Sequence, residues 1–132
     1  MKNYNKKAQL NILEMASVGV YLRKEGIKDL VELDFEDRMY IGQTKYNKKL
    51  NVQIPNGLGY MVWADGSSYN GNFSNGEYDE FGEYESSDGK KKRGVWSEGK
   101  FLYKERIFSI VEQIKHIKMD NKPETQNNLT PK

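Results

Sequence analysis

The chain has 132 residues, which is the size of one domain with a modest hydrophobic core. Its 21 basic and 19 acidic residues give a net charge of +2, and this balance argues against a general attraction for nucleic acid. Cysteine is absent, which excludes disulfides, thiolate metal sites and cysteine nucleophiles and fits a cytoplasmic, reducing environment.

The N-terminal residues 1–28 are predicted to form a helical cap. The apolar run from residue 10 to residue 22 is interrupted by Asn11 and Glu14 and is too short to span a bilayer. Gly26 is a suitable place for the helix to end. The positions whose spacing is compatible with one helical face are Leu10, Leu13, Ser17, Val20 and Tyr21.

A repeat occupies the middle of the chain. The segments "GYMVWADGSSYNGNFSNG" and "GEYESSDGKKKRGVWSEG" align their glycines, their Asp-Gly pairs and their aromatic residues at an offset of 23 positions. A weaker copy, "VELDFEDRMYIG", precedes them and has Glu-Asp in place of Asp-Gly. Alternating side chains around a glycine-containing turn indicate β-hairpins. Residues 29–103 are therefore predicted to form an antiparallel sheet of about three hairpins.

The Tyr-x-Gly pattern has a physical explanation in a strand. Strand alternation places Tyr69, Gly71 and Phe73 on one face. The missing side chain of Gly71 leaves a gap, in which a ring from a neighbouring strand can lie against the backbone.

The stretch "GLGYMVWADGSSYNGNF" resembles the MORN (membrane occupation and recognition nexus) repeat, a short hairpin with Tyr-x-Gly and Gly-x-Gly…Asp-Gly patterns. The next copy departs from the pattern, because it has "EFG" for Gly-x-Gly and Lys92 at the tyrosine position. The resemblance covers residues 31–101 and implies an elongated, twisted antiparallel sheet. It also implies a homodimer formed through the ends of the sheet.

The C-terminal segment is predicted to contain a helix over residues 104–119 and a disordered tail over residues 120–132, which has no apolar anchor. The apolar stripe of this helix is Ile107, Ile110, Val111, Ile114 and Ile117. The predicted fold class is mainly β: a MORN-like hairpin sheet flanked by an N-terminal and a C-terminal α-helix, which would cover a sheet face and the sheet ends.

No motif supplies catalytic chemistry. His116 is the only histidine, it has no companion ligands in the sequence, and no serine lies in a nucleophile elbow. The acidic segment 77–88 lacks the spacing of a calcium loop and is predicted to be a solvated strand face, with a partner-facing patch as the alternative. We therefore expect no enzymatic activity, no metal and no cofactor.

A basic run follows the last Asp-Gly turn. A solvated hairpin tip is the simpler interpretation, and contact with anionic lipid or phosphate is the alternative. Four charges are fewer than firm membrane attachment requires. The candidate anion contacts are Lys90, Lys91, Lys92 and Arg93.

The aromatic residues of the repeats are the candidate binding surface. Three interpretations remain open: a structural ladder between repeats, a groove for a peptide or helix, and a platform for a carbohydrate or small ligand. The candidate partner-binding residues are Tyr40, Trp63, Tyr69, Phe73, Tyr84 and Trp96.

We accordingly expect a non-enzymatic protein-protein interaction module or small adaptor that binds another protein through its aromatic face. One alternative is a small inhibitor, such as an antitoxin, an immunity protein or a phage protein that blocks a host factor. The other is binding of a small ligand, a glycan or an anionic lipid.

Overall fold

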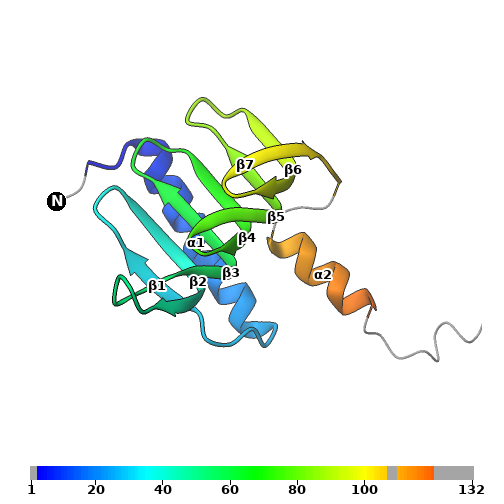
Figure 1. Ribbon diagram of the computed structural model, residues 1–132. Helices are drawn as coiled ribbons and strands as arrows, with labels where there is room; N and C mark the ends of the chain where they lie inside the picture. The colour runs from blue at the N-terminus through cyan, green and yellow to red at the C-terminus, as the bar shows by residue number, and fades with distance from the viewer. Residues whose placement is uncertain (1–2, 107–109, 121–132) are drawn as a thin grey trace, which may run out of the picture.

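The computed structural model describes residues 3–106 and 110–120 of the chain. Helix α1 (Lys6–Lys24) is followed by a sheet and then by helix α2 (Ile110–Asp120) (Figure 1). The strands are β1 (Val31–Asp34), β2 (Arg38–Asn47), β3 (Val52–Trp63), β4 (Ser68–Ser74), β5 (Glu77–Glu85), β6 (Lys91–Ser97) and β7 (Lys100–Lys104). The predicted fold class is confirmed: the protein is mainly β, with an antiparallel hairpin sheet that one helix precedes and another helix follows in the sequence.

Each strand pairs antiparallel with the next one along the chain, so the sheet has the order β1-β2-β3-β4-β5-β6-β7. The three hairpins expected from the repeat are β1–β2, β3–β4 and β5–β6. Gly66 and Gly89 have φ values of 94° and 91° in the turns of the last two hairpins, as their Asp-Gly sequences predict. The repeat therefore corresponds to the hairpin unit of the sheet.

The C-terminal boundaries differ from the prediction. Lys104, predicted as the first residue of the helix, is the last residue of β7, because it continues the pairing with β6 opposite Gly94. Helix α2 begins at Ile110 and includes Asp120, which was predicted to belong to the tail. Ile107 and the tail beyond residue 120 lie outside the described residues.

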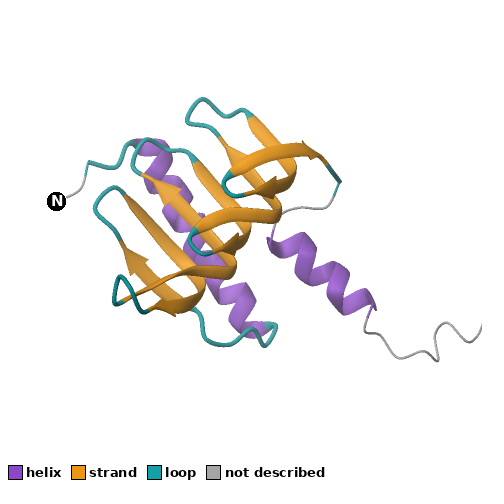
Figure 2. Cartoon of the chain, viewed as in Figure 1, coloured by secondary structure: helices purple, strands orange, loops and turns teal. Residues whose placement is uncertain are grey.

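Five glycines lie side by side on five successive strands, and we call them the glycine row: Gly42, Gly59, Gly71, Gly82 and Gly94. A Cβ added to Gly42 would lie 2.4 Å from the Cα of Gly59, and one added to Gly71 would lie 2.4 Å from the Cα of Gly82. No side chain fits in this approach, so the backbones of neighbouring strands can come this close only at glycine. Figure 2 shows that the sheet is strongly curled.

Helix α1 covers one face of the sheet. Its buried residues include Ala8, Met15 and Leu22, which join Ile41 and Val62 from the strands in one hydrophobic cluster. Figure 1 shows the helix running behind the strands. Neither α1 nor α2, in the part of the chain that is described, is long and apolar enough to cross a membrane.

The helix forms where the spacing predicts it, but most of the apolar positions that indicated it do not face the sheet, and of these five only Tyr21 is partly buried against the cluster. Leu10, Leu13 and Val20 are 66%, 67% and 52% exposed, so they point away from the sheet. The helix is oriented by polar contacts with the β3–β4 turn. Asn11, which is buried, donates a hydrogen bond to the Gly66 carbonyl at 3.0 Å. The buried side is itself apolar, through Ala8, Met15 and Leu22, so α1 carries two apolar stripes and the Asn11 hydrogen bond belongs to the one that faces the sheet.

Helix α2 packs on the same face as α1. Ile110 and Ile114 are buried in the cluster that contains α1, as the predicted stripe requires, while the side chain of Ile117 lies outside the described part. The first backbone amide of the helix, that of Ile110, donates to Oδ1 of Asn70 on β4 at 2.9 Å. The sheet itself thus supplies the N-terminal hydrogen-bond acceptor that a helix needs.

Candidate interaction face

The other side of the sheet carries an aromatic cluster to which neither α1 nor α2 contributes. We call it the aromatic face. Its centre consists of the buried residues Tyr40, Met61, Tyr69, Phe73 and Trp96. Its rim consists of the partly buried residues Leu33, Phe35, Trp63, Tyr78, Tyr84 and Phe101.

The centre of the aromatic face is tightly packed around Tyr69. The Tyr69 ring stacks on Tyr78 with 3.9 Å between centroids, and it makes edge contacts with Phe73 and Trp96 at 5.1 and 5.5 Å. Its hydroxyl donates to the Asn72 carbonyl at 2.9 Å. The centre is therefore a core with its polar groups satisfied.

The gap expected at Gly71 occurs one strand further along. The ring of Tyr69 leaves its own strand and lies over Gly82, where an added Cβ would be 2.0 Å from the hydroxyl oxygen. Tyr40 covers Gly59 in the same way, at 2.1 Å. The tyrosine of each of these Tyr-x-Gly patterns thus fills the space left by the missing side chain of a glycine on the next strand, and this contact joins the two strands.

The predicted binding residues divide into two groups by burial. Tyr40, Tyr69, Phe73 and Trp96 are at most 5% exposed, so they have almost no surface to offer a partner. Trp63 and Tyr84 are half-buried on the rim and remain accessible. The six residues belong to one cluster, but only these two can touch another molecule.

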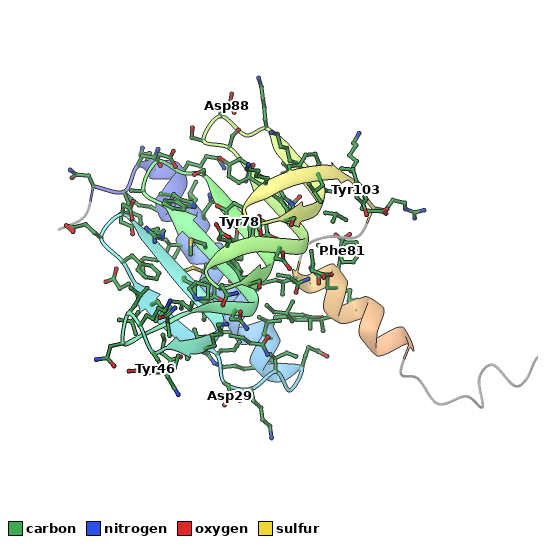
Figure 3. The ribbon with its side chains drawn as sticks, in the orientation of Figure 1. Asp29, Tyr46, Tyr78, Phe81, Asp88 and Tyr103 are labelled. Atoms are coloured by element: carbon green, nitrogen blue, oxygen red, sulfur yellow. The ribbon has the colours of Figure 1, made fainter. Side chains whose placement is uncertain are left out.

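The rim also holds aromatic residues that the sequence analysis did not identify. Phe35 comes from the segment before β2, and Tyr78 and Phe101 come from β5 and β7. Tyr78 and Phe101 are 23 positions apart, so the repeat offset itself was a signal that could have found them. Figure 3 shows Tyr78 near the middle of the sheet.

Cations lie over the rim. The guanidinium carbon of Arg38 is 4.4 Å from the ring centroid of Phe35 and 4.7 Å from that of Trp63. The Lys92 ammonium is 5.8 Å from the centroid of Phe101. Cation–π contacts of this kind keep the positive charges against the rings, so the rim combines aromatic surface with positive charge.

The phenols add no negative charge at neutral pH. Burial raises the pKa of Tyr78 to about 12 and raises the pKa of Tyr40 and Tyr69 further. The Trp63 indole donates to the Tyr78 hydroxyl at 3.1 Å, which fixes the orientation of the tryptophan. These three phenols therefore stay uncharged at neutral pH, and Trp63 has a fixed hydrogen-bond partner on the rim.

The four predicted anion contacts do not form one patch. Lys91 and Arg93 both pair with Glu83, at 3.9 and 2.5 Å, while Lys92 points to the opposite side of the strand. Lys90 lies 3.9 Å from Asp88. Strand alternation separates these side chains, and acidic groups of the same chain neutralise three of them.

In residues 3–106 and 110–120, no three His, Cys, Asp or Glu side chains are grouped so that they could hold a metal ion. The side chain of His116 lies outside the described part.

Neither a scan against models of known protein families nor a search of curated proteins returned a match for this chain.

Proposed function

We propose that this chain is a MORN-like, non-enzymatic interaction module that binds a segment of another protein on the rim of its aromatic face. The observation that carries the proposal is that both helices pack against one side of the sheet, while aromatic residues gather on the other side, to which neither α1 nor α2 contributes.

The rim has the composition of a binding surface. Aromatic residues and arginine are enriched at the energetic centres of protein interfaces. Trp63 is held by the Tyr78 hydroxyl and by the Arg38 guanidinium, so it loses little freedom when a partner binds. Tyr84, the other accessible residue of the predicted set, lies in the same cluster on a strand of the next hairpin.

The charges indicate the chemistry of the partner. Arg38 already pairs with Asp37 at 2.7 Å, so Lys92 is the rim cation that favours a segment with a carboxylate next to its apolar side chains. A second copy of the chain, joined through the sheet ends, is the other proposed partner.

The test is affinity capture of the tagged protein from a lysate of the organism that encodes it, read by mass spectrometry. The rim variant carries Trp63→Ala and Tyr84→Ala. The matched control carries Tyr46→Ala and Tyr103→Ala, which remove aromatic residues that are 50% and 54% exposed elsewhere on the molecule (Figure 3). Circular dichroism melts establish that both variants are folded.

We expect one stoichiometric partner that the control retains and the rim variant loses, with an affinity at least about thirtyfold weaker when the purified pair is titrated. Equal capture by both variants would contradict the proposal. Loss of the partner's own activity in a one-to-one complex would identify the module as an inhibitor, and retained activity would identify it as an adaptor.

A further inference from the structure

The outer side of α1 carries apolar residues that the chain leaves exposed. Leu10, Leu13 and Val20 are 66%, 67% and 52% exposed. Ala16 and Ser17, which lie between them on the same side, are exposed as well. We call these five residues the outer stripe.

The outer stripe has the spacing of a helix-pairing seam. Positions 10, 13, 17 and 20 are separated by three, four and three residues, which is the a/d pattern of paired helices. The opposite side of α1 is already buried against the sheet through Ala8, Met15 and Leu22. A helix that is apolar on two sides is typical of a helix covered on both.

The small residues in the middle of the stripe favour a helix as the occupant. Ala16 and Ser17 separate Leu13 from Val20, so the backbone of a second helix could approach closely there while its larger side chains pack beside the leucines. Scattered exposed leucines need no explanation, but a continuous row on one helical face does.

The charges at the two ends of the stripe are positive. Lys6 lies at one end and Arg23 and Lys24 lie at the other; all three are exposed, and they make no ion pair within the described residues. The only acidic residue of α1, Glu14, accepts a hydrogen bond from the Tyr60 hydroxyl at 3.1 Å.

This charge pattern selects the occupant. Two copies of α1 packed antiparallel would bring Lys6 of one copy against Arg23 and Lys24 of the other, and parallel packing would bring each cation against its own equivalent. An acidic partner helix would gain at both ends instead.

We infer that the outer stripe is a second docking surface, and that its occupant is an amphipathic helix of a partner protein with an aliphatic seam and acidic flanking residues. The surface lies on the opposite side of the sheet from the aromatic face and does not depend on the function of that face. Two such surfaces would let one small chain hold two partners at once.

The test uses the full chain and a fluorescent three-heptad peptide with leucine at its seam positions and glutamate at its flanking positions. A second peptide keeps the seam and replaces the glutamates with lysine. The stripe variant carries Leu10→Gln and Leu13→Gln. The matched control carries Leu50→Gln and Leu102→Gln, at positions that are 65% and 56% exposed elsewhere.

We expect the glutamate peptide to bind the wild type and the control alike, and to bind the stripe variant at least about tenfold more weakly. A further variant, Arg23→Glu with Lys24→Glu, should weaken binding of the glutamate peptide and strengthen binding of the lysine peptide. Absence of binding, equal binding to the stripe variant, or equal binding of both peptides would overturn the inference.

Two other occupants give distinct results. If the chain itself dimerises in analytical ultracentrifugation and the stripe variant is a monomer, the occupant is a second copy. If the chain binds vesicles of phosphatidylserine and phosphatidylcholine through the stripe and does not bind the glutamate peptide, the occupant is a membrane surface. Either result would overturn the assignment of an acidic helix.

Discussion

The substitution Gly82→Ala tests whether the tyrosines of the repeats require the glycines on which they lie. A Cβ at position 82 would be 2.0 Å from the Tyr69 hydroxyl oxygen and 2.2 Å from its Cζ atom. Gly82 is not among the described residues with positive φ, so alanine can adopt its backbone conformation. The whole cost of the substitution should therefore come from the contact with the ring.

The ring of Tyr69 has no room to move away. It is fully buried, it stacks on Tyr78 at 3.9 Å, and Phe73 and Trp96 contact it at their edges. Forcing extra volume into a packed core costs about 1–3 kcal/mol. Displacing the Tyr69 hydroxyl from the Asn72 carbonyl adds about 1 kcal/mol. We expect Gly82→Ala to lower the free energy of unfolding by about 2–4 kcal/mol.

The assay is urea unfolding followed by tryptophan fluorescence and circular dichroism, carried out as a double-mutant cycle with Tyr69→Leu. Leucine lacks the atoms that an alanine at position 82 would meet, although Tyr69→Leu is itself destabilising. In that background Gly82→Ala should be neutral or slightly stabilising, because alanine loses less backbone entropy than glycine. The expected coupling is about 2 kcal/mol or more.

A substitution at a second glycine distinguishes the effect of the ring contact on stability from the effect of the backbone conformation. Gly76 has a φ of 87°, and a Cβ there would meet nothing within 4 Å. Gly76→Ala should destabilise through its backbone alone, by the same amount whether residue 69 is tyrosine or leucine. If Gly82→Ala also cost the same in both backgrounds, the ring contact would not be the reason for the glycine, and the explanation of the Tyr-x-Gly pattern would be wrong.

Two further predictions concern a turn and a helix end. The hydroxyl and the backbone amide of Ser67 donate to the Asp65 carboxylate and hold the pKa of this group below its usual value. The Asp65 carboxylate therefore stabilises the fold at pH values above its pKa in the unfolded chain. This stabilisation is lost as the pH falls through its lower pKa in the folded protein. Asp65→Asn should therefore lower the melting temperature at neutral pH, and the difference from wild type should vanish in acid; a difference independent of pH would contradict this. Asn70→Ala removes the acceptor for the Ile110 amide and should cost about 1 kcal/mol. Hydrogen exchange should quicken in α2 but not in α1, and an unchanged α2 would refute the capping role.

The hairpins were predictable because their determinants are local. Asp-Gly turns and alternating strands recur at a fixed offset of 23 residues, and each hairpin forms around its own turn. Strand β7 obeys the same offset, since Phe101 follows Tyr78, but the apolar residues beyond it favoured a helix from residue 104. The register of β7 opposite Gly94 decided that boundary.

Burial of the aromatic residues was not predictable from the sequence, because it depends on the curl of the whole sheet. The glycine row becomes visible only when five strands are placed in register. Strand parity correctly put Tyr69 and Phe73 on one face, but parity does not tell whether that face closes on itself. Of the six predicted binding residues, Tyr40, Tyr69, Phe73 and Trp96 consequently became core, and only Trp63 and Tyr84 remained at the surface.

The orientation of α1 shows that, in a helix with two apolar sides, the sequence pattern alone does not tell which side faces the sheet. Burying Leu10 and Leu13 would require the helix to turn about its axis, which would carry the Asn11 amide away from the Gly66 carbonyl. The helix would also lose its close approach to the sheet at Gly19, where a Cβ would be only 2.6 Å from the Ile41 side chain. Because one side of α1 fits the sheet so closely, its aliphatic residues on the other side contribute nothing to that packing, and their regular spacing is better explained by a second contact outside the chain.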